Sequence, residues 1–287
     1  MGDRTPRALT LLELGRVSNL PTVWTNILAA TVLAGAEVQL ARTVTLAGAI
    51  SSLYVAGMFL NDAFDREYDA RYRPERPIPA GRISARTVFT TGLTLLAAGV
   101  VILSTLGLRA AAWGFGLAAL IFYYDVNHKR DPFSPVLIAL CRALVYCIVS
   151  VAVAGLVTRA AATGGALVAA YVTGLSYAAK QEGRPALAAV WPLALLFTPF
   201  VYLTPVLRQV DPAAGVFLVF LLWVVFAARR LVRGGASIGL GVIRLLAGIA
   251  LLDALLMLRA GAPVELVAIA VLAFTATRAL QRWVPAS

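Results

Sequence analysis

The sequence predicts an all-α fold, a polytopic transmembrane bundle of nine to ten helices around a central cavity. Of its 287 residues, 60% are hydrophobic and only 14% are charged, and the mean hydropathy is +0.84. Ordinary soluble domains are roughly half apolar and about one quarter charged. The apolar residues also come in repeated blocks of about 20, the length that a helix needs to cross a bilayer core. The composition therefore excludes an ordinary soluble domain.

Long apolar stretches divide the chain into ten candidate spans. Their approximate ranges are 20–38, 43–61, 87–107, 110–125, 135–157, 162–179, 187–206, 213–228, 237–257 and 263–280. Some connections are very short, such as Gly107 to Arg109, and helices joined in this way must run antiparallel. We therefore expect a single domain that covers residues 1–287.

The basic residues indicate the orientation of the bundle. If the first residues are cytoplasmic, most Lys and Arg lie in the inner segments, and the outer segments hold only Arg42, Arg109, Arg159, Arg208 and Arg259. Cytoplasmic loops of membrane proteins collect Lys and Arg. Orientation thus explains the formal net charge of +11 without nucleic acid as a partner. We expect a multi-pass protein of the cytoplasmic membrane, embedded in the lipid bilayer, with its active site facing the cytoplasm.

Acidic residues are concentrated at the end of the second span and just after it. The spacing of Asp62, Asp65 and Asp69 places them on one face of a continuing helix, with Asn61 one turn before Asp65. Like charges on one face repel each other unless a cation bridges them. Mg²⁺ binds a few carboxylate oxygens and completes its shell with water and substrate phosphates. The alternative interpretation is an ion-pair network between these acids and the arginine-rich segment 66–86.

A longer pattern extends from these acids into the next loop. It reads Asn61-Asp62-x-x-Asp65-x-x-x-Asp69, followed by Arg73-Pro74-Glu75-Arg76-Pro77-Ile78-Pro79-Ala80-Gly81-Arg82-Ile83-Ser84. This combination resembles the first Asp-rich motif and following loop of the UbiA superfamily of intramembrane prenyltransferases. Because the helical pattern continues to the end of the sequence, the resemblance extends over nearly the whole chain.

The resemblance implies a magnesium-dependent prenyltransferase, which moves a prenyl group from a polyprenyl diphosphate to an unidentified acceptor. In that family the Asp-rich helix end holds Mg²⁺ on the donor diphosphate, and an apolar tunnel receives the isoprenoid tail. On this chain the implied metal ligands are Asp62, Asp65 and Asp69, assisted by Asn61. Metal and basic side chains would neutralise the departing diphosphate while an allylic carbocation develops.

A basic patch follows the fourth span, where the sequence reads Tyr123-Tyr124-Asp125-Val126-Asn127-His128-Lys129-Arg130. It resembles the family's basic patch after its fourth helix. The resemblance implies Lys129 as a catalytic diphosphate contact, with Arg130, Tyr124 and Asp125 as further candidates, together with Arg73 or Arg76. The alternative for the two basic residues is an anchor on the cytoplasmic side. The single histidine, His128, has no second His or Cys ligand near it, which argues against a transition-metal site.

The sequence departs from the family at the end of the sixth span, where a second Asp-rich motif is usual. Here it reads Tyr177-Ala178-Ala179-Lys180-Gln181-Glu182, without aspartate. Glu182 is a candidate single ligand, and Lys180 a candidate fixed positive charge, although the two residues could instead pair with each other. This variant resembles the EboC-like branch of the superfamily. Two alternative functions follow from the departure: a UbiA-like terpene cyclase, or a non-catalytic carrier or transporter of an isoprenoid or lipid.

Polar residues inside the spans must face the interior of the bundle, because they are costly in lipid. Three charged residues lie within the spans: Arg142, Arg244 and Asp253. We therefore predict a structural pair of Asp253 with one of the two arginines. The functional alternative is that Arg142 reaches the substrate pocket. In the first span Arg16, Asn19, Thr22 and Asn26 form a polar stripe. Asn19 and Asn26 are therefore candidates for contacting substrate, with interhelical hydrogen bonding as the alternative.

Overall fold

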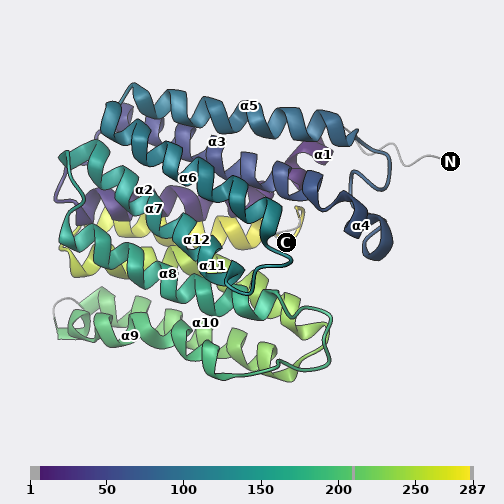
Figure 1. Cartoon of the computed structure of the whole chain (residues 1–287). Coiled ribbons are helices and arrows are strands. Elements are labelled where there is room, and N and C mark those ends of the chain that lie inside the picture. Colours follow the sequence, from purple (N-terminus) through teal and green to yellow (C-terminus); the bar gives the residue numbers. More distant parts are fainter. Residues whose placement is uncertain (1–6, 209–210, 285–287) are drawn as a thin grey trace.

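The computed structural model of the chain describes residues 7–208 and 211–284. Within these residues the fold is entirely helical (Figure 1), which confirms the predicted class. The α-helices are α1 (Arg7–Leu14), α2 (Leu20–Leu33), α3 (Leu40–Phe64), α4 (Arg66–Tyr72), α5 (Ala85–Ser104), α6 (Leu108–Asn127), α7 (Ser134–Ala154), α8 (Arg159–Ala179), α9 (Thr198–Leu203), α10 (Asp211–Arg233), α11 (Ser237–Arg259) and α12 (Val264–Leu280). Three 3₁₀ helices are η1 (Val17–Asn19), η2 (Trp191–Phe197) and η3 (Thr204–Arg208).

Although α2 covers only part of the span expected at 20–38, the expected spans coincide with single helices except at 187–206. There the chain forms η2, α9 and η3 in succession instead of one helix. Each of the three pieces has a proline at its second position, namely Pro192, Pro199 and Pro205. Proline lacks an amide hydrogen and is tolerated only in the first turn of a helix, so each one begins a new piece.

Among the described residues, five helices are long and apolar enough to cross a membrane by length and composition alone. They are α3, α5, α7, α11 and the stretch Ala213–Arg233 of α10. Other helices at expected spans are shorter or less apolar, and α2 has only 14 residues, roughly 21 Å of helix. Most residues of α2 are nevertheless buried. This short helix therefore lies in the protein interior, where it does not have to match the bilayer.

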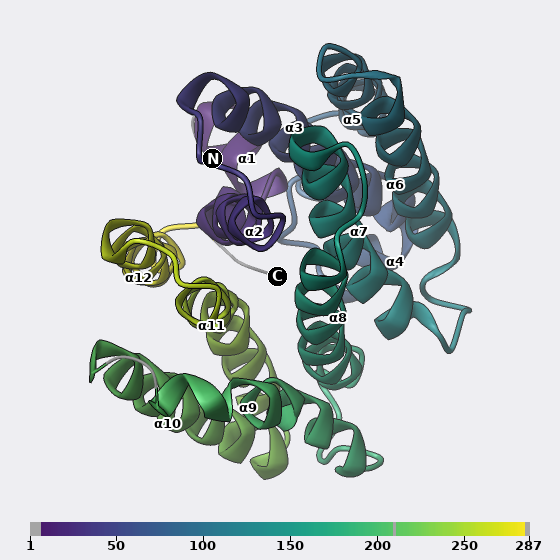
Figure 2. The ribbon, with the colours of Figure 1, turned by 90° about the vertical axis from the view of Figure 1, so that its left-hand side faces the viewer.

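The long helices run side by side, and the loops that follow α3, α6 and α8 gather at one end of the bundle (Figure 1). Viewed end-on, α2, α3, α6, α7, α8 and α11 surround a common interior (Figure 2). α5 covers the outer side of α3 and α6, while α10 and α12 flank α11. The core consists of one large apolar cluster and a smaller one around Leu14, Phe59, Ala63 and Val88. Nearly every residue in the central part of α11 is buried.

Close contact between α3 and α5 fixes the direction in which α3 approaches the gathered loops. Gly92 and Gly99 of α5 face Leu60 and Leu53 of α3, and a Cβ atom at Gly99 would lie 2.6 Å from Leu53 Cγ. Such a contact is shorter than the sum of atomic radii, so only glycine permits this approach. At the loop end, Ser84 Oγ caps α5 by accepting the Thr87 N–H at 3.1 Å.

Asp253 of α11 is completely buried and binds polar groups of two neighbouring helices. Its Oδ2 accepts hydrogen bonds from Thr25 Oγ1 at 2.5 Å and from Asn26 Nδ2 at 2.8 Å, and its Oδ1 accepts one from Tyr146 of α7. Because a buried carboxylate without partners is very costly, these donors determine how α2, α7 and α11 pack.

Arg142 and Asp253 are linked indirectly. Arg142 Nη1 donates to Asn26 Oδ1 at 2.7 Å, and the same amide donates to Asp253. Arg244 instead lies over the ring of Phe226, at 4.8 Å from its centroid. The predicted structural pair of Asp253 with Arg142 or Arg244 is therefore wrong, because Asn26 lies between Asp253 and Arg142, and Arg244 packs on Phe226 instead.

Candidate active site

The acidic motif lies where α3 passes into α4. Asp62 is in the last turn of α3, Asp65 follows its end, and Asp69 belongs to α4. Backbone hydrogen bonds continue across the junction, from Asp65 N to Asn61 O at 2.9 Å and from Asp69 N to Asp65 O at 2.8 Å. The expected helical continuation is therefore present with only a small break at Asp65, and all three acids reach the end of the bundle where the loops gather.

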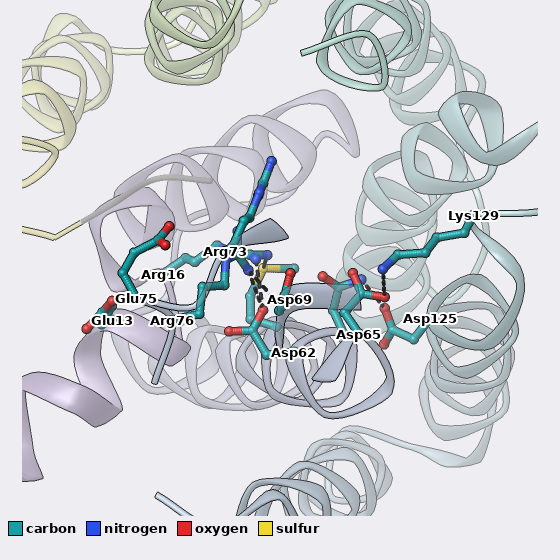
Figure 3. Close-up of polar contacts among 12 residues, drawn as sticks. Glu13, Arg16, Asp62, Asp65, Asp69, Arg73, Glu75, Arg76, Asp125 and Lys129 are labelled. Atoms are coloured by element: carbon teal, nitrogen blue, oxygen red, sulfur yellow. Dashed lines mark hydrogen bonds and ion pairs between the residues drawn. The ribbon is translucent and has the colours of Figure 1, made fainter. Parts of the chain in front are cut away.

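Asp62 is held by two arginines (Figure 3). Its Oδ1 lies 3.0 Å from Arg16 Nη2 and 2.9 Å from Arg76 Nη1. Arg76 also approaches Asp69 Oδ2 at 3.9 Å. Arg16 has a left-handed backbone, with φ of 43°, a conformation that is costly for a residue with a side chain. Arg16, which pairs with Asp62, therefore has a strained backbone conformation directly before η1.

Asp65 faces the basic patch at the end of α6 (Figure 3). Its Oδ1 lies 2.7 Å from Lys129 Nζ, and its Oδ2 lies 3.4 Å from His128 Nε2. Lys129 also lies over the Tyr68 ring at 3.7 Å from the centroid. Burial acts to raise the pKa of Asp65, but the hydrogen bonds from His128 and Lys129 outweigh it and hold that pKa below its usual range.

Asp69 differs from Asp65 although only four residues separate them. Burial raises the pKa of Asp69, and the nearby Asp65 and Asp62 raise it further, while Arg76 opposes them. The ionised form of a carboxyl with a raised pKa, next to two other acids, is the one that an added cation stabilises most. The motif thus contains one carboxylate already neutralised by a lysine and one whose negative charge is less well compensated.

Asp125, in the last turn of α6, has an unsatisfied carboxylate oxygen. Its side chain is only 3% exposed, Asn61 Nδ2 donates to Oδ1 at 3.4 Å, and Oδ2 is buried without a hydrogen-bond partner. Tyr124 stacks on His128 beside it. An acceptor atom left free in this position is available to a group that enters from the cavity.

The segment after α8 contributes Lys180 and Glu182, which do not pair with each other. Lys180 Nζ donates to the backbone O of Asp131 at 2.6 Å and to Ser134 Oγ at 2.8 Å. Glu182 Oε2 lies 3.7 Å from Arg73 Nη2. Lys180 therefore links this segment by hydrogen bonds to the start of α7. Glu182 instead contacts Arg73, which follows α4.

One cavity of about 890 Å³ joins these groups to the apolar interior. Most of its polar lining comes from helix ends and loops, although Tyr54 of α3 and Arg142 of α7 lie in the middle of their helices. Its apolar lining comes from mid-helix residues such as Ile50, Leu53, Leu117, Val145 and Ile249. The cavity is therefore amphipathic, with a charged end and an apolar extension between the helices.

Most residues predicted from the sequence meet in this cavity. Those that line it are Asn19, Asn61, Asp65, Asp69, Arg73, Arg76, Tyr124, Asp125, Lys129, Arg142, Tyr177, Lys180 and Glu182. Three others do not: Asp62 is engaged with its two arginines, Asn26 is buried beside Asp253, and Arg130 is exposed beyond the end of α6.

Two residues of the site, Arg16 and His128, were named from the sequence but given no role in it. Arg16 lines the cavity and binds Asp62 across 46 positions of sequence, a partnership that spacing along one helix does not indicate. His128 lines it as well and faces Asp65. Its place directly before Lys129 was a usable signal, because both side chains leave the same helix end.

These features define a class of protein: an integral membrane helical bundle with an amphipathic cavity whose charged end lies among acidic and basic loops. Residues 19–286 match the profile of one such family, and the chain belongs to it: the UbiA prenyltransferase family. This finding agrees with the resemblance of the acidic motif and extends it over most of the chain.

Curated relatives share part of the sequence. The chain is 35% identical over 119 residues to digeranylgeranylglyceryl phosphate synthase of Ignicoccus hospitalis, a match that covers 42% of this chain and 39% of that protein. It is 39% identical over 125 residues to the enzyme of the same name from Methanothrix thermoacetophila, a match that covers 43% of this chain and 47% of that protein. The matches thus span less than half of these relatives' lengths.

Solved structures share the fold. A UbiA homologue from Aeropyrum pernix K1 aligns with a TM-score of 0.66 and 17% identity over 84% of this chain and 96% of the other. A structure described as digeranylgeranylglyceryl phosphate synthase in membranes aligns with a TM-score of 0.58 and 17% identity, over 88% and 98%. At this identity the likeness concerns the helical architecture alone.

Proposed function

We propose that the protein is a magnesium-dependent prenyltransferase, which moves a prenyl group from a polyprenyl diphosphate to a small-molecule or lipid acceptor. The main support for this proposal is that the charged end of the 890 Å³ cavity continues into an apolar interior. A polyprenyl diphosphate has the same division, with an anionic head and a long hydrocarbon tail. The apolar helices would hold the tail and exclude water from the reacting carbon.

The residues at the charged end suit Mg²⁺ in their donor chemistry. Asn61, Asp65 and Asp69 supply amide and carboxylate oxygens to one cavity, the ligands that this hard ion prefers. Within the described residues, however, no three His, Cys, Asp or Glu side chains are already grouped as a metal site. We propose Asn61, Asp65 and Asp69 as the direct ligands, since these three line the cavity, whereas Asp62 does not and is held by Arg16 and Arg76. When bound, Mg²⁺ would supply positive charge to the departing diphosphate.

The basic side chains would hold the remaining phosphate oxygens. Lys129, Arg73 and Arg76 line the same charged end, and guanidinium groups bind phosphate in a bidentate manner. During transfer the bond between the prenyl carbon and the diphosphate oxygen breaks, and the electron pair leaves with the diphosphate. A nucleophilic atom of the acceptor bonds to that carbon and loses a proton, for which the free Oδ2 of Asp125 is the proposed receiver.

The names of the relatives suggest which acceptor to test first. Digeranylgeranylglyceryl phosphate synthase is named for a glyceryl phosphate that carries geranylgeranyl groups. We therefore propose a prenylated glyceryl phosphate as the first candidate acceptor and geranylgeranyl diphosphate as the first donor. The distribution of Lys and Arg supports a cavity that opens toward the cytoplasm.

The test is an incubation of the purified full chain with labelled prenyl diphosphates of several lengths, with Mg²⁺ or with EDTA, and with or without the acceptor. We expect magnesium-dependent pyrophosphate release together with a prenylated acceptor. Pyrophosphate and a cyclic hydrocarbon without acceptor would instead identify a terpene cyclase. A folded protein that releases no pyrophosphate from any donor with acceptor present would contradict the proposal and favour a carrier.

A further inference from the structure

Three arginines from three helices lie close together outside the cavity. They are Arg230 in the last turn of α10, Arg244 in the first half of α11 and Arg278 in the last turn of α12. α11 packs between the other two helices along one side of the bundle (Figure 2). None of the three arginines lines the central cavity. Within the described part of the chain, every ion pair with a carboxylate is formed by other residues.

Two of these guanidinium groups also have unsatisfied hydrogen-bond donors. Arg230 Nε and Arg244 Nη1 are buried atoms without a hydrogen-bond partner. A buried donor that lacks a partner costs free energy, and the cost is greater for a charged group. The free energy would be recovered if an acceptor with negative charge lay between the helices at this position.

Aromatic rings hold the cluster in place. The Phe226 ring lies under both Arg230 and Arg244, at 5.3 Å and 4.8 Å from its centroid, and Arg278 lies 5.5 Å from the Trp223 ring. Trp223 Nε1 in turn donates to the backbone O of Arg244 at 2.8 Å. Cation–π contacts offset part of the desolvation cost, but they leave Arg230 Nε and Arg244 Nη1 without a hydrogen-bond partner.

The cluster lies on the outer surface of the bundle rather than in its interior. Phe226 is 47% exposed, and the neighbouring Leu222 is 59% exposed. In an integral membrane protein such an apolar outer surface faces the hydrocarbon chains of lipids. A ligand at this position therefore has an anionic group for the arginines and hydrocarbon for the exposed Leu and Phe side chains.

We propose that Arg230, Arg244 and Arg278 form a binding site for the phosphate group of an anionic membrane lipid. Basic pockets between transmembrane helices recognise lipid head groups in this way, and the planar guanidinium matches phosphate oxygens. The three arginines belong to the bundle end that also carries the acidic motif, since Arg278 donates to Gln281, which donates to Asn19 of the cavity lining. The site is separate from the proposed catalytic site and does not depend on it.

The probe is phosphatidylglycerol added to the full chain in an uncharged detergent, with phosphatidylcholine of the same acyl chains and inorganic phosphate as comparison arms. We expect phosphatidylglycerol to raise the Tm by several degrees at concentrations where the other two have no effect. Arg244→Gln should fold, because it removes a charge without a carboxylate partner, and it should raise the half-saturating lipid concentration at least tenfold. Arg278→Gln, a second variant of the site, should act in the same direction.

Arg259→Gln is the matched control, because Arg259 is on the same helix and also lies over an aromatic ring, that of Tyr202. This variant should keep the response to phosphatidylglycerol. An unchanged response in both Arg244→Gln and Arg278→Gln would overturn the proposal. Equal stabilisation by phosphatidylcholine would overturn the requirement for an anionic lipid, and equal stabilisation by inorganic phosphate would overturn the requirement for a lipid.

Discussion

Lys129 Nζ lies 2.7 Å from Asp65 Oδ1, and this contact joins the end of α6 to the junction of α3 and α4. The two residues are 64 positions apart in the sequence, and each is proposed to act on the same diphosphate, Asp65 through the metal and Lys129 directly. Lys129 is 37% exposed in its side chain, so it is able to turn from the carboxylate toward a phosphate oxygen. The contact therefore brings the metal ligand and the phosphate contact to one point of the cavity.

Lys129→Met should reduce the rate of pyrophosphate release about 10²- to 10³-fold, because one charge that stabilises the transition state is lost. The Tm should fall only modestly, since Lys129 is 37% exposed and Asp65 keeps its contact with His128. Steady-state kinetics and a thermal melt measure the two effects. Arg130→Gln is the matched control, and its rate should stay within about twofold because Arg130 is exposed and does not line the cavity. Equal losses in both variants would contradict the direct role of Lys129.

Arg76 and Asp62 should be energetically coupled. Both side chains are mostly buried, with 15% of Arg76 and 8% of Asp62 exposed, and Arg76 Nη1 lies 2.9 Å from Asp62 Oδ1. A double-mutant cycle with Arg76→Gln and Asp62→Asn, followed by denaturant unfolding, should give a coupling energy of about 1–3 kcal/mol. The exposed pair Arg66 and Glu67 serves as the comparison and should give less than about 0.5 kcal/mol. Additive effects for Arg76 and Asp62 would show that the ion pair is not maintained.

Lys180 should act on stability rather than on metal binding. Lys180→Met removes the donor to Asp131 O and Ser134 Oγ, and we expect a loss of about 1 kcal/mol in stability. The Mg²⁺ concentration for half-maximal activity should not change. Asp69→Asn should raise that concentration at least several-fold, because a proposed ligand is lost. A shift in Mg²⁺ requirement for Lys180→Met as large as that for Asp69→Asn would contradict this division of roles.

Asp253→Asn should lower stability and leave catalysis intact. Its carboxylate accepts from Thr25, Asn26 and Tyr146, and an amide has only one acceptor oxygen, so at least one buried donor loses its partner. We expect a cost of about 1–3 kcal/mol, seen as a lower Tm, with kcat within about threefold of the unchanged protein at a temperature where both are folded. A normal Tm with a large loss of kcat would assign Asp253 to the reaction instead.

The acidic motif shows why part of the site could be predicted from the sequence. Helical spacing determines which side chains share a helix end, and backbone hydrogen bonds do continue from Asn61 through Asp65 to Asp69. Spacing does not determine which distant charge will lie opposite. Asp62 binds Arg16, which precedes it by 46 positions and reaches it from a left-handed turn that no periodic pattern encodes.

The sequence interpretation departs from the structure in two places, for different reasons. The apolar stretch 187–206 has the length of a span, but its prolines divide it into short pieces. Asp253 and Arg142 are correctly predicted to face the interior, yet Asn26 lies between them and binds both. Composition indicates that a buried charge needs partners, whereas only the packing of the helices determines which donors reach it.

Asp65 is proposed to help hold a magnesium diphosphate in the cavity, and calorimetric titration of inorganic pyrophosphate measures this binding. The titration is done with the full chain, with Mg²⁺ or with EDTA, for the unchanged protein, Asp65→Asn and the control Glu67→Gln, whose side chain is 84% exposed. We predict binding that requires Mg²⁺, weakened at least tenfold in Asp65→Asn and unchanged in Glu67→Gln. Pyrophosphate binding that is as strong in EDTA, or as strong in Asp65→Asn, would contradict the account.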